Sequence, residues 1–294
     1  MSTSSQFWNN VQYAPIGGLR FAYQVFGEGL AGEPWVLIRG LGTQMTEWPS
    51  ALIEGLVARG SPVLAFDNRD SGLSSGFEAA GTNAAAYALS DMAGDVLGLL
   101  DHLGWERANV LGASMGGMIA QLLAARSPSR ICSMVSVMSS SGGTGLPPPT
   151  PEAAQVLTAT PSSKASIDET VELVLAGRRL LAGRGYFVSD EERRPLVRAA
   201  VERSWRPDGV VRQLRAVMAC GSRLDDLAGI RVPSLVIHGD DDALLPLEHG
   251  ADCARAIPGA RFEVIEGMGH DIPASLVPSL FGVLDAFLAG SPSE

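Results

Sequence analysis

Asn109-Val110-Leu111-Gly112-Ala113-Ser114-Met115-Gly116 is a short apolar run that ends in a serine flanked by small residues, and residues 117–125 continue almost entirely apolar. This pattern predicts a buried strand, a tight turn and a helix. Gly112 and Gly116 suit a turn in which larger side chains would collide. Such a turn lifts the hydroxyl of Ser114 clear of the backbone, so Ser114 is the candidate nucleophile. The N–H of Met115, which begins the helix, is a candidate donor to developing negative charge.

Strand and helix patterns alternate on both sides of this turn. Short apolar or alternating runs predict further strands at residues 19–26, 35–38, 62–66, 131–138, 234–237 and 261–265. Helical spacing predicts helices at residues 50–59, 84–103, 248–256 and 277–288. This order is typical of the α/β class, in which a mostly parallel sheet is covered by helices on both faces.

One long interruption breaks the alternation at residues 141–224. It opens with Gly142-Gly143 and Pro147-Pro148-Pro149 and continues as charged helical sequence. We expect an inserted helical lid over the carboxyl edge of the sheet, where open α/β sheets bind ligands. The predicted organisation is a core of residues 1–140 and 225–294, in which residues 1–10 form a disordered tail, and a lid of residues 141–224.

Composition limits the partners and the location. The 294 residues are 46% apolar and 18% charged, which is a globular balance with material for a large core. A net charge of -10 without a Lys/Arg-rich run argues against a nucleic-acid partner. The three cysteines form no CxxC pair, and the chain shows neither a signal-like start nor a membrane-spanning apolar run. We therefore expect a cytoplasmic protein with no membrane partner. The sequence does not indicate the oligomeric state.

A serine hydroxyl needs a base to take its proton, and histidine is the usual base near neutral pH. The chain has four histidines. His102 falls in a predicted helix, His238 ends a predicted strand, and His249 falls in a later helix. His270 lies in a glycine-rich loop directly after the last predicted strand, from which it can reach over the sheet edge. His270 is therefore the candidate base.

The acid that orients the base is expected between nucleophile and base in chain order. Residues 133–151 contain no Asp or Glu, so the loop after the next strand is excluded. The later strand at residues 234–237 runs into Asp240-Asp241-Asp242. Spacing alone leaves all three aspartates open.

A second oxyanion donor is expected in the loop Arg39-Gly40-Leu41-Gly42, which follows the strand at residues 35–38. The N–H of Leu41 is the candidate. The same Gly-x-Gly is no dinucleotide fingerprint, since Met45 stands where the third glycine belongs. With neither an HExxH motif nor a Cys/His cluster, the sequence predicts no cofactor and no metal.

Together these residues resemble the α/β-hydrolase superfamily over essentially the whole chain outside the tail and the lid. Phe66-Asp67-Asn68-Arg69-Asp70-Ser71-Gly72-Leu73-Ser74 looks like the family's D-x-R-x-x-G-x-S loop. The segment at residues 38–49, with Trp48-Pro49, is similar to the aclacinomycin methylesterase-type subgroup. The resemblance implies this fold, ester hydrolysis, and Asp242 as the acid.

The expected reaction is hydrolysis of a small-molecule carboxylic ester of small to medium, apolar character through an acyl-enzyme. The same triad serves lactone opening, thioester hydrolysis or carbon–carbon bond hydrolysis, and a non-catalytic ligand-binding member of the fold is a further alternative. Gly40, Arg39 and Trp48 are candidate substrate-binding residues. Many relatives have histidine where this chain has Arg39, and this cation either recognises a substrate carboxylate or, as we favour, pairs with a neighbouring acid.

Overall fold

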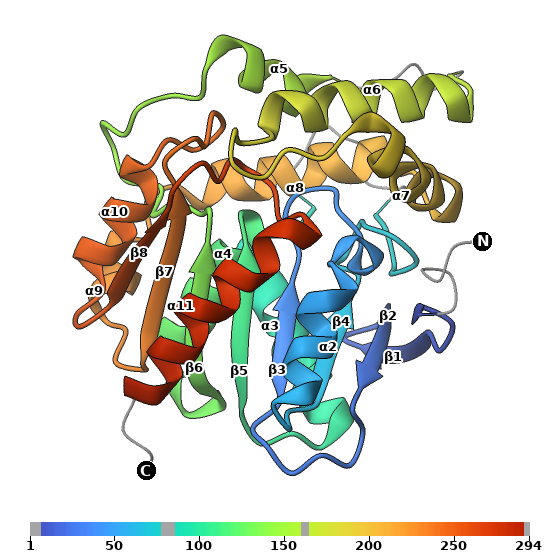
Figure 1. Ribbon diagram of the computed structural model, residues 1–294. Coiled ribbons are helices and arrows are strands. Elements are labelled where there is room, and N and C mark those ends of the chain that lie inside the picture. The colour runs from blue at the N-terminus through green and yellow to red at the C-terminus, as the bar shows by residue number, and fades with distance from the viewer. Residues whose placement is uncertain (1–6, 78–85, 160–164, 291–294) are drawn as a thin grey trace.

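The computed structural model describes residues 7–77, 86–159 and 165–290, and in these residues it shows one eight-stranded sheet (Figure 1). The strand order is β1-β2-β4-β3-β5-β6-β7-β8. The strands are β1 (Gln12–Ile16), β2 (Leu19–Phe26), β3 (Trp35–Ile38), β4 (Val63–Phe66), β5 (Ala108–Ala113), β6 (Ile131–Val137), β7 (Ser234–Gly239) and β8 (Arg261–Ile265). β2 is antiparallel to both β1 and β4, and the pairs from β4 through β8 are parallel. The predicted α/β class is confirmed.

Helices cover both faces of this sheet (Figure 1). The α-helices are α2 (Ser50–Ala58), α3 (Leu89–Leu103), α4 (Met115–Arg126), α5 (Pro151–Thr158), α6 (Ile167–Leu181), α7 (Asp190–Arg203), α8 (Pro207–Cys220), α9 (Leu224–Ala228), α10 (Glu248–Ala256) and α11 (Val277–Gly290). The 3-10 helices are η1 (Met45–Glu47), η3 (Pro128–Arg130) and η4 (Ala274–Leu276). None of these described helices is both long and apolar enough to cross a membrane.

The core is divided by the sheet into two apolar clusters. Val36 and Ile38 of β3 face the cluster that α3, α4 and α10 cover. Trp35 and Leu37, which alternate with them, face the cluster that α2 and α11 cover. Each apolar side chain buried here contributes about 1.5–3 kcal/mol to the stability of the fold. Strands that are buried on both faces are therefore continuously apolar. This explains why the short runs in the sequence predicted strands correctly.

Two predictions about boundaries need correction. The helix predicted at residues 84–103 begins at Leu89, where the carboxylate of Asp91 accepts the N–H of Ala88 at 2.8 Å and caps it, and residues 84–85 lie outside the described residues. Of the predicted disordered tail, residues 1–6 are also outside. Phe7, however, stacks on Phe26 with ring centroids 4.7 Å apart, so residues 7–10 are not the tail we expected.

Helices α5–α8 lie over the carboxyl ends of the parallel strands (Figure 1). They come from the segment at residues 141–224, and α6 and α7 pack on each other through Val171, Leu175, Val197 and Val201. The strands β5, β7 and β8 all point their carboxyl ends toward these helices. Side chains that follow these three strands therefore meet in the space beneath α5–α8.

Candidate active site

Ser114 occupies a strained turn between β5 and α4. Its backbone has φ 55° and ψ −118°, a conformation that a non-glycine residue adopts only when its surroundings enforce it. A Cβ on Gly112 would lie 2.1 Å from the carbonyl oxygen of Gly116, and one on Gly116 would lie 2.0 Å from that of Ile38. Both glycines are therefore required by the close approach of backbone to backbone.

The structure brings Ser114, His270 and Asp242 into one hydrogen-bonded line. The Oγ of Ser114 lies 2.9 Å from Nε2 of His270, and Nδ1 of His270 lies 2.7 Å from Oδ2 of Asp242. An ionised carboxylate only accepts hydrogen bonds, so Nδ1 carries the proton and Nε2 is left to accept from the hydroxyl. That tautomer is the one in which histidine can act as a base toward the serine.

Asp242 is selected from the three aspartates by its position in the turn after β7. Its Oδ1 accepts the N–H groups of Leu244 and Leu245 at 2.9 and 2.8 Å, and the residue is buried. Burial alone raises the pKa of Asp242, but His270 and His238 outweigh it and hold the pKa well below its ordinary value. The carboxylate therefore stays ionised beside His270.

The other two aspartates brace loops around the site. Oδ1 of Asp240 accepts the N–H of Gly267 at 2.6 Å, and Oδ2 of Asp241 accepts the N–H of Arg184 at 2.7 Å. Gly267 belongs to the loop that carries His270, while Arg184 follows α6. These two carboxylates thus hold the histidine loop and the end of α6 in place.

The remaining histidines do not contact Ser114. His102 faces the hydroxyl of Tyr23, and His249 bonds to Ser140 and Pro147. His238, however, reaches the site: its Nε2 lies 2.7 Å from the carbonyl oxygen of Leu245 and 3.4 Å from Oδ2 of Asp242. Sequence reasoning missed this contact, and the only signal was the position of His238 at the strand end, four residues before the acid.

Two backbone N–H groups near the nucleophile have no hydrogen-bond acceptor in the part of the chain that the structure describes. Among the described residues, those of Leu41 and Met115 form no hydrogen bond, whereas the N–H of Gly42 donates to Gln213 at 2.8 Å. Gly40 packs directly against the nucleophile, since a Cβ on it would lie 3.2 Å from the Cβ of Ser114. Both predicted oxyanion donors, Leu41 and Met115, therefore keep an N–H group without a partner among the described residues.

Arg39 is buried, with 5% of its surface exposed, and its guanidinium lies over the ring of Trp48 at 4.6 Å. Its Nε donates to Oγ1 of Thr43 at 3.3 Å. It forms no ion pair with any described residue, so the pairing that we favoured is not formed. Burial lowers the pKa of Arg39 to about 10, although Glu47 and Asp271 nearby act to raise it.

The end of α6 is docked on the loop that carries the histidine. The N–H of His270 donates to the carbonyl oxygen of Leu181 at 2.8 Å, and a Cβ on Gly269 would lie 2.5 Å from that same oxygen. The N–H of Gly185 also donates to Gly267 at 2.9 Å. The segment at residues 141–224 therefore fixes the backbone of the base as well as lying over it.

Known proteins resemble this chain along most of its length. The sequence model of the alpha/beta hydrolase fold family matches residues 33–176. Rhodomycin D methylesterase DnrP from Streptomyces peucetius is 31% identical over 278 residues, which cover 86% of this chain and 90% of the relative. A 2-hydroxy-6-oxononadienedioate/2-hydroxy-6-oxononatrienedioate hydrolase from Cupriavidus pinatubonensis is 28% identical over 86% of each chain.

Solved structures show the same relationship. The enol-lactonase from Burkholderia xenovorans superimposes with a TM-score of 0.75 and 26% identity, covering 95% of this chain and 100% of its own. These matches confirm the resemblance that the glycine-flanked serine and the loop motifs indicated. The chain therefore belongs to the α/β-hydrolase family.

Proposed function

We propose that this protein is a serine hydrolase that cleaves small-molecule carboxylic esters through an acyl-enzyme. The observation that carries the proposal is the continuous line from Ser114 through His270 to Asp242, with contacts of 2.9 and 2.7 Å. The similarity to a methylesterase over 86% of the chain supports ester cleavage. A binding protein would have no need of a strained serine aligned with a base.

In the proposed reaction, Oγ of Ser114 attacks the ester carbonyl while Nε2 of His270 takes its proton. Asp242 holds the tautomer of His270 and stabilises the imidazolium, and the N–H groups of Leu41 and Met115 hold the oxyanion. The tetrahedral intermediate collapses, and His270 returns the proton to the leaving alcohol. Water then attacks the acyl-enzyme while His270 takes its proton, and His270 returns this proton to Oγ of Ser114 as the acid is released.

Lactones are a second candidate substrate class, because the enol-lactonase from Burkholderia xenovorans is 26% identical over nearly the whole chain. A lactone is a cyclic ester, so the same steps open it, and the alcohol stays attached to the acid. The carbon–carbon bond hydrolase class has a specific relative as well, at 28% identity. Turnover of matched open and cyclic esters separates the first two classes.

We infer that residues 141–224 form a lid over this site. Its helices α5–α8 lie over the carboxyl ends of the strands, and Leu181 at the end of α6 bonds to the backbone of His270. Gly40 and Trp48 belong to the loop beneath it, and we propose that they shape the substrate-binding surface.

The test is hydrolysis of p-nitrophenyl esters of increasing chain length by the wild type and by Ser114→Ala. Removing the nucleophile is expected to lower kcat by roughly 10,000-fold to a million-fold. Ser90→Ala is the matched control, because Ser90 is exposed on α3. Labelling of wild type by a phosphonate probe, located at Ser114 by mass spectrometry, is expected to disappear in Ser114→Ala. Undiminished turnover by that variant would overturn the proposal.

A further inference from the structure

Three arginines and two carboxylates gather between the sheet edge and helices α6 and α7. This arginine cluster consists of Arg39, Glu47, Arg178, Arg193 and Asp271. Arg178 pairs with Glu47 and lies 3.6 Å from Asp271, and Nη1 of Arg193 donates to Oδ2 of Asp271 at 2.6 Å. The cluster therefore joins α6 and α7 to the 3-10 helix η1 and to the residue that follows His270.

The arginine cluster carries one cation more than its carboxylates can neutralise. Glu47 and Asp271 are engaged by Arg178 and Arg193, and Arg39 has no ion pair among the described residues. A further acid near Arg193 is Asp190, which is already paired with Arg179 at 2.5 Å. A buried cation that forms no ion pair is unfavourable, and burial together with the neighbouring Arg178 lowers the pKa of Arg39.

The same region holds three buried hydrogen-bond donors that have no acceptor. They are Nη1 of Arg39, Nε1 of Trp48 and Nη2 of Arg193, each without a partner among the described residues. Arg39, Trp48 and Arg193 are 5%, 2% and 8% exposed, so bulk water does not reach most of their surface. Buried donors are normally satisfied, and all three unmet groups here are donors. What the region lacks is an acceptor, and the surplus cation favours one that is negatively charged.

The arginine cluster also adjoins the reacting atoms. Arg39 directly precedes Gly40, which packs against the side chain of Ser114. Asp271 directly follows His270. Arg39 and Arg193 both act electrostatically on Asp271, so an acceptor that accepts from both would lie close to the residues that adjoin the nucleophile and the base.

We propose that the arginine cluster is a carboxylate-binding subsite, and that the substrate is an ester or lactone that also bears a carboxylate away from the scissile bond. The planar guanidinium groups of Arg39 and Arg193 donate to that carboxylate, which supplies the missing acceptor and neutralises the surplus cation. A single negative charge suffices, which favours a carboxylate over a doubly charged phosphate. This inference rests on the proposed ester hydrolysis and names its substrate class.

The test compares the monomethyl and dimethyl esters of succinic, glutaric and adipic acids near neutral pH, with methanol release as the readout. Each pair has the same chain, but only the monomethyl ester carries a carboxylate. For the chain length that spans the site, we expect the wild type to prefer the monomethyl ester in kcat/KM by about tenfold to a hundredfold, mostly through a lower KM. No preference at any length would overturn the inference.

Arg39→Met keeps the length of the side chain and removes its charge. We expect this variant to lose most of the preference for the monomethyl over the dimethyl ester in kcat/KM, because the ratio of the two values reports recognition of the carboxylate. The matched control is Arg194→Met, because Arg194 is a neighbouring arginine of α7 that pairs with Glu172 at the surface. A purely structural role for Arg39 would instead lower turnover of both esters equally, and that outcome would overturn the inference.

Binding of adipate to wild type provides a readout that needs neither catalysis nor a folded variant. We expect calorimetry to detect adipate but not its neutral diamide, and adipate to inhibit dimethyl ester hydrolysis competitively. If the wild type hydrolyses none of the esters yet binds adipate, the proposed function fails and the subsite stands. If it hydrolyses dimethyl esters through Ser114 but prefers no monomethyl ester and does not bind adipate, the subsite fails and the proposed function stands.

Discussion

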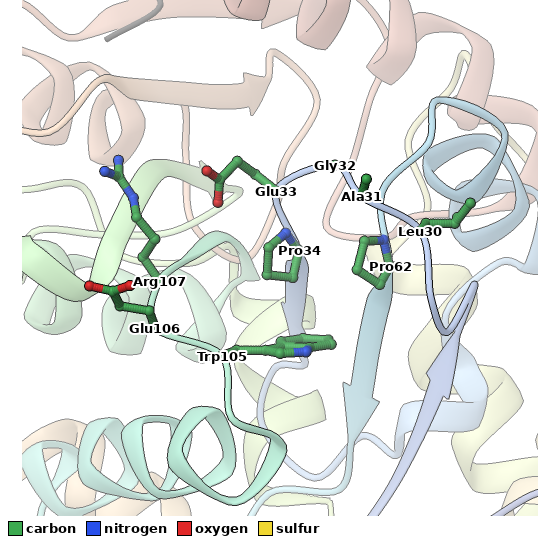
Figure 2. A pocket seen from close by; sticks show the side chains of 9 residues that line it. All are labelled: Leu30, Ala31, Gly32, Glu33, Pro34, Pro62, Trp105, Glu106 and Arg107. Atoms are coloured by element: carbon green, nitrogen blue, oxygen red, sulfur yellow. The ribbon is translucent and has the colours of Figure 1, made fainter.

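The carboxyl and amino ends of the parallel strands differ in how much strained backbone lies beside them. At the carboxyl ends, Asp70, Ser114 and Met138 follow β4, β5 and β6 with φ values of 65°, 55° and 42°. These are the non-glycine residues of positive φ in the part of the chain that the structure describes. At the amino ends lies a hollow of about 370 Å³, whose lining is shown in Figure 2 and includes Pro34 before β3 and Pro62 before β4.

Charge follows the same division. Near the carboxyl ends, Arg212 pairs with Asp70 at 2.7 Å, and both side chains are essentially inaccessible. Near the amino ends, Arg130 pairs with Asp101 at 2.7 Å, and the side chain of Asp101 is 68% exposed. Buried pairs and strained backbone lower stability unless the surroundings compensate, while exposed pairs contribute little either way. Strained backbone and buried charge, rather than a hollow, therefore mark the edge at which Ser114, His270 and Asp242 meet.

The largest expected effect that sharpens this comparison comes from Asp242→Asn. An amide at this position can donate to Nδ1 of His270 and so favours the tautomer in which Nε2 cannot accept the proton of Ser114. We expect kcat to fall about 10,000-fold with the fold retained, as measured by ester turnover and circular dichroism.

The control for this variant is Asp101→Asn at the amino edge. It removes one partner of an exposed ion pair, so activity should be unchanged and the free energy of unfolding should fall by at most about 1 kcal/mol. Equal losses of kcat in the two aspartate variants would mean that the carboxyl edge has no special role.

A smaller effect is expected from His238→Leu. The side chain of His238 is buried, and its Nε2 bonds to the carbonyl oxygen of Leu245. The same nitrogen lies 3.4 Å from Oδ2 of Asp242. We interpret it as a positioning residue that fixes the acid, and expect kcat to fall about tenfold and stability to fall by about 1–3 kcal/mol.

His249→Leu separates positioning from stability. His249 is also buried and makes two hydrogen bonds, but to Ser140 and Pro147 rather than to the acid. It should lose comparable stability in a thermal melt while keeping kcat and the pH–rate profile of wild type. A similar loss of kcat in both variants would show that His238 has no particular influence on Asp242.

The sequence predicted the fold class and most strands because strands buried on both faces are continuously apolar, as at residues 35–38 and 63–66. It also predicted which side chains meet, since Ser114 and His270 both follow strands whose carboxyl ends share one edge. The catalytic roles of these residues stay predictions. The start of α3 was placed too early because helical spacing does not show where a helix is capped.

Most other contacts between distant segments could not be predicted. Spacing does not separate Asp242 from its two neighbours, because the choice is made by the N–H groups of the turn at Leu244 and Leu245. The burial of Arg39 without a counter-ion depends on helices more than a hundred residues away, since α6 and α7 supply the cations that engage Asp271. Local patterns record burial and turns, and they carry no information on such pairings.

The smallest expected effect concerns Cys132, a nucleophilic residue type at the amino edge. Its Sγ lies 2.9 Å from Nε of Arg107 and donates to Oε2 of Glu33 at 3.2 Å. Burial, helped by Glu33 and opposed by Arg107, raises the pKa of the Cys132 thiol to about 11. Because only the thiolate reacts readily, alkylation of Cys132 by iodoacetamide should be slow at neutral pH and become faster as the pH approaches 11, as followed by mass spectrometry.

Cys220, also partly exposed, is the internal comparison, and Cys132→Ala should keep ester turnover within about twofold of wild type. Fast alkylation of Cys132 at neutral pH together with loss of turnover would place reactive chemistry at the amino edge, and the contrast between the two edges would then be wrong.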